Sequence, residues 1–132
     1  MNSLNPACPN PEKDALISFY HATDGDNWNN NSGWLNTGIS ICDWYGVTCN
    51  DSLHVTALDL SEDNLSGALP VNLSDLRDLQ TLDLNDNHIT SIDTDVFDGL
   101  GDLTELNLAD NAISVIPTGT FDGLENLDSL DL

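Results

Sequence analysis

Hydrophobic residues recur with a period of 24 positions from about residue 53 to the end of the chain. Six apolar columns keep this register over three or four copies, which is too regular to arise by chance. Each copy contains a short stretch, such as LQTLDL at 79–84, in which apolar and polar residues alternate. Alternation with period two is typical of a strand with one buried face. The columns are Leu58, Leu82, Leu106 and Leu130; Leu60, Leu84, Leu108 and Leu132; Val55, Leu79, Leu103 and Leu127; Leu76, Leu100 and Leu124; Leu65, Ile89 and Ile113; and Leu73, Phe97 and Phe121.

The repeat divides the second part of the chain into about 3.5 units. A unit of this size buries its leucines only against its neighbours, so we expect the units to stack their strands into one parallel sheet. The last unit stops on a strand that leaves Leu130 and Leu132 uncovered. We therefore expect a fragment of a longer protein, or an edge that pairs with another chain. The units span 53–75, 76–99, 100–123 and a truncated 124–132.

The pattern L-x-x-L-x-L-x-x-N-x-I/L in these units resembles the leucine-rich repeat, and a period of 24 residues lies within that family's range. The resemblance implies an α/β solenoid, with short parallel strands on a concave face and loops and short 3-10 turns on the convex side. LSGALP at 65–70 resembles the plant-type variant of the repeat, with Gly67 allowing a turn and Pro70 ending it. The later units look more like the variant common in animal and bacterial extracellular proteins, so the source kingdom stays open.

Asn87 and Asn111 occupy the column in which this family places a buried asparagine. An amide both donates and accepts, so it can satisfy loop backbone groups that would otherwise be buried without partners. The first unit has Asp63 in this column, and an ionised aspartate only accepts. We expect a structural role for Asn87 and Asn111 and an altered arrangement at Asp63.

After a flexible N-terminus at 1–9, residues 10–52 are suited to covering the first repeat, whose apolar end would otherwise be exposed. Asn10 and Pro11 predict a helix start, because asparagine caps helices and proline suits the first helical position. An apolar stripe then follows on about three helical turns. It consists of Ala15, Leu16, Phe19 and Tyr20.

The segment CDWYGVTC at 42–49 resembles the N-terminal cap of plant receptor-type and polygalacturonase-inhibitor-type leucine-rich-repeat proteins. That resemblance implies a structural disulfide between Cys42 and Cys49 just before the first strand. It also implies that Trp44 and Val47 close the end of the core.

The stretch HATDGDNWNNNSGW at 21–34 has the composition of a calcium-binding loop. It does not match the template, because Trp28 stands at the third ligand position and Leu35 replaces the glutamate at the twelfth. Similar G-D-N-W loops occur in the caps of the family. We interpret the stretch as a cap loop in which Trp28 and Trp34 pack against the helix.

Charge is the extreme feature of the composition, with 23 acidic residues, two basic residues and a net charge of −21. Such a surface repels phosphates, so we exclude nucleic acid and anionic lipid as partners. It suits a solvated surface adapted to a salty setting, and it also suits a face that binds basic partners or divalent cations. No apolar run approaches the roughly 18 residues that span a membrane, so we expect no membrane insertion in this segment.

The sequence holds no arrangement typical of an enzyme or a metal centre. Its three histidines are scattered, no nucleophile lies in a recognisable motif, and no C-x2-C or histidine pair indicates zinc. We therefore expect a non-enzymatic protein with no metal and no cofactor. A disulfide between Cys42 and Cys49 favours an oxidising compartment, so we expect a secreted or cell-surface protein whose signal peptide is not present in this chain.

The outward positions of the predicted strands form polar columns on the concave face, again at steps of 24 residues. The family resemblance implies that this face recognises a protein or peptide, and its acidity favours a basic one. Two alternatives stay open, a surface or adhesion element in which divalent cations bridge the aspartates and a purely structural segment of a longer protein. The oligomeric state is open as well. The candidate ligand-binding residues are Asp59, Thr81, Asp83, Asn85, Glu105, Asn107 and Asp131.

Overall fold

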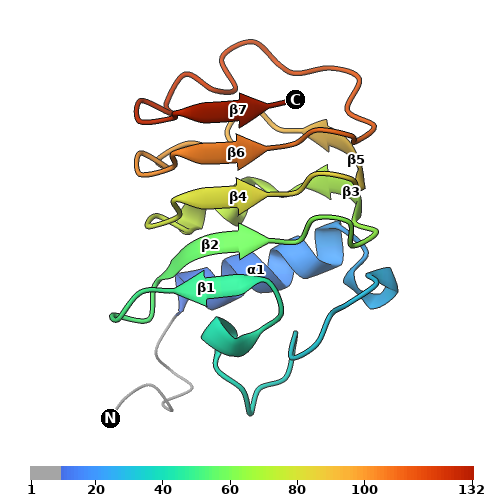
Figure 1. The fold of residues 1–132 in the computed structure, drawn as a ribbon, viewed down its shortest axis with the longest axis vertical. Helices are drawn as coiled ribbons and strands as arrows, with labels where there is room; N and C mark the ends of the chain where they lie inside the picture. Colours follow the sequence, from blue (N-terminus) through green and yellow to red (C-terminus); the bar gives the residue numbers. More distant parts are fainter. Residues whose placement is uncertain (1–9) are drawn as a thin grey trace.

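The computed structural model describes residues 10–132, so the expected flexible N-terminus at 1–9 lies outside the described residues. Its main sheet contains four parallel strands, β2 (Val55–Asp59), β4 (Thr81–Asp83), β6 (Glu105–Asn107) and β7 (Ser129–Asp131). They stack one above the other in Figure 1. Equivalent leucines lie side by side in the stack, as Leu58 and Leu82 do. The predicted solenoid with its parallel sheet is confirmed.

The sheet begins with a strand that the repeat pattern does not predict. Strand β1 (Val47–Cys49) belongs to the cap and pairs antiparallel with β2, so the strand order is β1-β2-β4-β6-β7. This pairing provides hydrogen-bond partners for backbone N–H and C=O groups that would otherwise be unpaired along the edge of the first repeat. The cap therefore extends the sheet in addition to covering the core.

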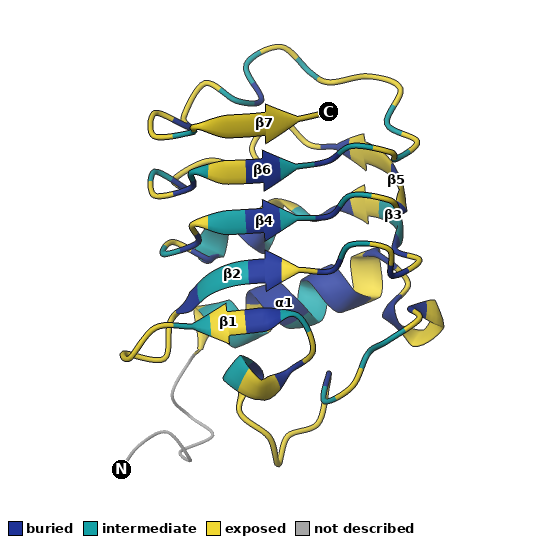
Figure 2. Ribbon diagram, in the orientation of Figure 1, coloured by how far each residue is buried: buried dark blue, intermediate teal, exposed yellow. Residues whose placement is uncertain are grey.

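The apolar columns fill the interior of the solenoid. In β4 and β6 the central leucine is buried while its two neighbours are partly or fully exposed (Figure 2). Leu82 is 1% exposed, as the alternating pattern predicts. Leu130, in the last described strand, is 39% exposed. Each repeat thus buries its leucines by contact with the repeats on both sides of it.

A second, smaller sheet lies on the other side of the core and corrects one expectation. The sequence predicts a turn at LSGALP, but these residues form a strand that pairs in parallel with its equivalent in the next repeat. Gly67 has a φ of +94° and lies where the register of this pairing shifts. The positive φ of Gly67 therefore permits a bulge within the strand and not a turn between two elements. The two strands are β3 (Ser66–Leu69) and β5 (His88–Ile92).

Helix α1 (Pro11–Ala22) covers the N-terminal end of the core. Asn10 caps it by accepting a hydrogen bond from the backbone N–H of Lys13 at 3.2 Å, so the predicted helix start is confirmed. Its buried face consists of Ala15, Leu16, Phe19 and Tyr20, the predicted stripe. The short 3-10 helices are η2 (Gly25–Asn27), η3 (Ile41–Asp43) and η4 (Val71–Asp75).

The stretch 21–34 is part of this scaffold. The rings of Trp28 and Trp34 lie 4.9 Å apart, measured between centroids. Each tryptophan also contacts the rings of Phe19 and Tyr20 on α1, at centroid distances between 5.1 and 6.4 Å. The prediction that both tryptophans pack against the cap helix is therefore confirmed.

Candidate functional site

The concave face of the main sheet brings together the residues predicted as a ligand site. Asp59 lies beside Asp83, Asp83 beside Asn107, and Asn107 beside Asp131 in neighbouring strands. Neighbouring strands lie about 4.8 Å apart. The four side chains therefore form one continuous polar column, which we call the acidic column.

A shallow depression of about 170 Å³ lies on this face. It contains a second column, in which Thr81 lies beside Glu105 in the neighbouring strand. The Thr81 hydroxyl donates a hydrogen bond to the Glu105 carboxylate at 3.5 Å. The two predicted residues outside the depression are Asp59, which lies in register beside Asp83, and Asn85, which follows β4. All seven candidates thus share one surface. The depression is lined by Thr81, Leu82, Asp83, Glu105, Leu106, Asn107, Ser129 and Asp131.

The turns at the strand ends fix the orientation of the acidic column. The Asp83 carboxylate accepts the backbone N–H of Asn85 at 3.1 Å, and the Asn85 side-chain amide donates to the same oxygen. One repeat later, Asn107 accepts the backbone N–H of Ala109 at 3.0 Å. Such turns, in which a side chain bonds the backbone two residues on, are common for Asp and Asn. The side chains of Asp83 and Asn107 are therefore oriented before any partner binds.

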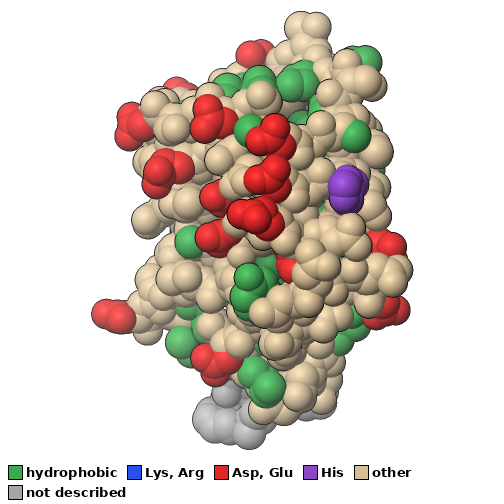
Figure 3. Space-filling view, turned by 45° about the vertical axis from the view of Figure 1, so that its right-hand side comes forward, with side chains coloured by type: hydrophobic (Ala, Val, Ile, Leu, Met, Phe, Trp, Pro, Cys, Tyr) green, Lys and Arg blue, Asp and Glu red, His purple; other side chains and the backbone are tan. Residues whose placement is uncertain are grey.

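A further row of acids follows the strand ends. Glu62, Asp86 and Asp110 are spaced by 24 residues, are exposed, and have φ values between +53° and +57°. Figure 3 shows acidic side chains gathered across the stacked repeats, with no Lys or Arg from residues 10–132 visible on that side. This concentration of like charge produces a strongly negative potential over the face.

The asparagine column joins consecutive repeats from the inside. The amide group of Asn87 donates to three backbone carbonyls at 2.9–3.1 Å, and its oxygen accepts two backbone N–H groups. Asn111 donates to the carbonyls of Leu84 and Leu108 and accepts the N–H of Ile89. These bonds satisfy backbone groups of the turns and of the start of β5, which fits a structural role.

Asp63 takes the same column in the first repeat and is 2% exposed. One carboxylate oxygen accepts the backbone N–H of Asn30 at 2.7 Å, while the other has no hydrogen-bond partner among the described residues. Burial raises the pKa of the Asp63 carboxyl above its usual range, and the bond from Asn30 opposes this only in part. The backbone of Asn29 also donates to the Asp63 carbonyl at 3.0 Å, so the cap loop is attached here.

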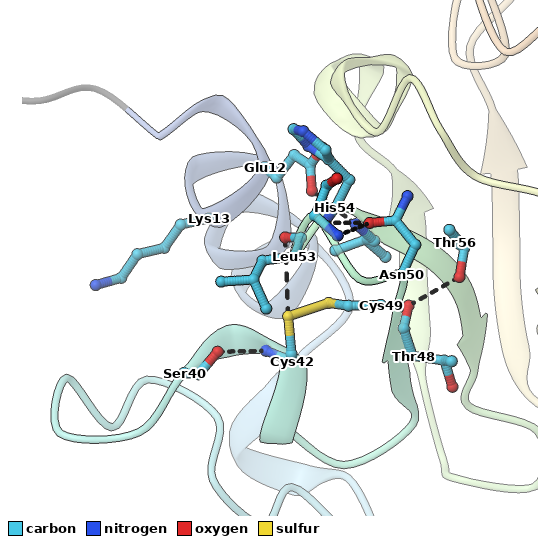
Figure 4. The surroundings of a disulfide bond; sticks show 12 residues. Glu12, Lys13, Ser40, Cys42, Thr48, Cys49, Asn50, Leu53, His54 and Thr56 are labelled. Atoms are coloured by element: carbon cyan, nitrogen blue, oxygen red, sulfur yellow. Dashed lines mark hydrogen bonds and ion pairs between the residues drawn. A yellow bond between two sulfur atoms is a disulfide. The ribbon is translucent and has the colours of Figure 1, made fainter. Parts of the chain in front are cut away.

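The predicted disulfide between Cys42 and Cys49 is confirmed and connects η3 to β1 (Figure 4). Trp44 lies within the loop that it closes and is 1% exposed. The Trp44 ring contacts that of Trp34 at a centroid distance of 5.0 Å. The bridge thus holds this tryptophan against the end of the core.

Three residues that the sequence pattern does not single out also lie together. Nδ1 of His54 is 3.0 Å from Oε2 of Glu12 and 3.9 Å from Oδ2 of Asp78. The hydrogen bond and charge of Glu12 raise the pKa of His54 above its usual value, and the charge of Asp78 adds to the effect. They belong to three separate segments, so no spacing motif could have revealed the cluster.

Stacked parallel strands, an asparagine column that joins the repeats and a helical cap define a repeat solenoid. A family model described as "Leucine rich repeat" matches residues 77–132, and one described as "Leucine rich repeat N-terminal domain" matches residues 9–50. The chain belongs to the leucine-rich-repeat family.

Among its relatives, "Leucine-rich repeat protein 2" of Arabidopsis thaliana is 42% identical over 72 residues, which are 54% of this chain and 32% of that protein. The chain therefore spans about a third of the length of this relative. None of the helices in residues 10–132 has the length and apolar character needed to cross a membrane.

Two solved plant structures share the fold. The Arabidopsis receptor kinase HAESA, in complex with the peptide hormone IDA and the co-receptor SERK1, has a TM-score of 0.77 and 27% identity, over 94% of this chain and 21% of that one. A plant ice-binding protein has a TM-score of 0.79 and 28% identity, over 95% of this chain and 40% of that one.

Proposed function

We propose that the chain is an extracellular, non-enzymatic interaction module that binds a basic protein or peptide on its concave face. The observation that carries the proposal is the acidic column, which continues across four strands and is oriented by turn hydrogen bonds at Asp83 and Asn107. A basic partner would meet a regular series of oriented oxygen acceptors. The negative field would raise the rate of association, and salt would lower it by screening the charges.

The two structural neighbours show why this proposal is argued from the side chains of the concave face and not from the fold. The HAESA structure contains a peptide hormone and a co-receptor, whereas the other neighbour is an ice-binding protein. One fold thus serves different ligands, and function has to be argued from the surface that the side chains create. In this chain that surface is acidic, which favours a cationic protein or peptide.

The disulfide and the relatives support the extracellular location that we propose. A structural disulfide is typical of a protein in an oxidising compartment. The curated relatives include a probable leucine-rich repeat receptor-like protein kinase, of which the chain covers 8%. We take residues 10–52 as the cap and residues 53–132 as the binding solenoid of such an extracellular region.

A binding experiment tests the proposal. Fluorescently labelled hexalysine is titrated with the unmodified chain and with the double variant Asp59→Asn, Asp83→Asn. Exposed charge pairs contribute about 0.2–1 kcal/mol each. Removing two carboxylates of the acidic column should therefore weaken binding by about 0.4–2 kcal/mol, which is roughly twofold to thirtyfold, with the larger loss at low salt.

The matched control is the double variant Asp95→Asn, Asp122→Asn, which removes the same charge from exposed positions outside the main sheet. It should bind hexalysine within about twofold of the unmodified chain. Equal losses in both double variants would mean that hexalysine senses only the net charge. That result would exclude the concave face as a specific binding surface.

A further inference from the structure

Glu12, His54 and Asp78 lie in an open groove of about 770 Å³ beside the start of α1. They come from the first turn of α1, from the position before β2 and from the segment before β4. One ligating atom of each lies within 4.8 Å of the others. Among residues 10–132, they are the only three His, Cys, Asp or Glu side chains with this property. The cluster is separate from the concave face, so it raises an independent question of function.

Glu12 is held from behind, which directs one of its oxygens to the cluster. Oε1 accepts the backbone N–H of Val55 at 2.8 Å, and the Glu12 side chain is 13% exposed. Oε2 then lies 3.0 Å from Nδ1 of His54. A carboxylate fixed through one oxygen keeps lone pairs on the other for a further ligand. Metal sites depend on supporting hydrogen bonds of this kind to orient their ligands.

His54 is positioned by the loop that the disulfide anchors (Figure 4). The side-chain oxygen of Asn50 accepts the backbone N–H groups of Ser52 and His54 at 2.9 and 3.1 Å. The residue before this loop is Cys49, which is bonded to Cys42. The His54 side chain is 53% exposed, so an ion from solvent can reach it. The imidazole is therefore placed beside the carboxylates while it remains accessible.

Neither of the two basic residues of the chain neutralises the cluster. In Figure 4, Lys13 extends away from His54. Arg77 lines the same groove, but its guanidinium lies against Gly99 at the end of the same repeat. Within residues 10–132 the carboxylates of the cluster form ion pairs with His54 alone. The groove thus offers negative charge to an incoming cation.

We propose that Glu12, His54 and Asp78 bind a divalent transition-metal ion, with zinc as the best match. Zinc bonds of about 2.0–2.2 Å place tetrahedral ligand atoms roughly 3.3–3.6 Å apart. The present separations from Nδ1 of His54, 3.0 and 3.9 Å, lie on either side of that range. An imidazole among carboxylates suits zinc, whereas calcium and magnesium prefer oxygen ligands alone. Water would complete the coordination shell.

Isothermal titration with ZnCl2 tests the proposal. The full chain is used with Cys8→Ser in every variant, because the sequence has a third cysteine at position 8 and cysteine sulfur is a common zinc ligand. Millimolar MgCl2 in the buffer occupies the many sites that carboxylates alone could provide. We expect one zinc ion per chain, and His54→Gln should lower the affinity at least about tenfold. His88→Gln, which changes another exposed histidine, should leave the affinity unchanged.

Thermal unfolding separates binding at this site from a folding defect. Zinc should raise the melting temperature of the parent chain and of His88→Gln, because a ligand that binds the folded state stabilises it. The melting temperature of folded His54→Gln should rise much less at the same zinc concentration. Equal zinc affinity in His54→Gln and His88→Gln, or no zinc binding in magnesium, would overturn the proposal and leave the cluster as an ion pair.

Discussion

Asp63 is the residue at which the chain departs from its own repeat. Asn87 and Asn111 fill the same column with amides that donate to neighbouring carbonyls, whereas an ionised aspartate can only accept. One Asp63 oxygen has no partner among the described residues, and burial raises the pKa of the carboxyl. A buried group without a hydrogen bond costs about 1–3 kcal/mol. Asp63 therefore makes a less complete set of hydrogen bonds than the asparagine at the same position of the next repeat.

Asp63→Asn should stabilise the protein at pH 7 by about 1–2 kcal/mol, because an amide supplies a donor and removes a buried charge. The advantage should shrink on acidification. Since the folded-state pKa of Asp63 is raised, its contribution to stability is fully present below the ordinary value of 3.8 and is lost as the pH rises through the folded pKa. Urea unfolding at pH 4 and at pH 7 measures both effects.

Asn87→Asp is the matched reverse substitution. It removes the donor that serves three backbone carbonyls and buries a charge, so it should destabilise the protein by at least about 2 kcal/mol at pH 7. If Asp63→Asn were no more stable than the parent chain at pH 7, the unpartnered oxygen would not be the weak point of the first repeat.

At the scale of elements, the cap holds the open end of the solenoid by two kinds of contact. The rings of Trp28, Trp34 and Trp44 pack in sequence, with centroid distances of 4.9 and 5.0 Å. The disulfide then connects η3 to β1, the strand that extends the main sheet. Because β1 pairs directly with β2, loosening the bridge should affect the first repeat as well as the cap.

Removal of the disulfide should destabilise the protein by about 2–3 kcal/mol, because the bridge closes a short loop in the unfolded chain. The substitution is Cys42→Ala with Cys49→Ala, and urea unfolding with and without reductant measures the change. Reductant should lower the midpoint of the parent chain and leave that of the double variant unchanged. A parent midpoint that does not respond to reductant would contradict a stabilising role for the bridge.

The elements that the sequence predicts well are those that it repeats. The step of 24 residues places Asp59, Asp83 and Asn107 on one face without any knowledge of distant contacts. The strand β3 is different, since Gly67 and the following proline favour a turn locally, and only pairing with β5 makes the segment a strand. No sequence pattern indicates the cluster around His54, because Glu12, His54 and Asp78 come together only when the cap packs against the repeats.

At the scale of the whole molecule, the net charge of −21 decides which partners the protein can approach. Within the described residues, ion pairs connect only His54 with Glu12 and Asp78. Most carboxylates therefore have no cationic partner in their own chain and repel one another across the surface. A basic partner would reduce this repulsion and would also form direct contacts with the carboxylates. Salt ions screen the same charges, so the affinity for a basic partner should fall as the salt concentration rises.

The most direct test of concave-face binding is a nitrogen-15 NMR titration of the chain with hexalysine. Amide signals of β2, β4, β6 and β7 and of the turns that follow them should shift first, saturate together and return toward their free positions when salt is added. Shifts spread evenly over the cap and the convex side, or confined to the groove around His54, would contradict the concave face as the binding surface.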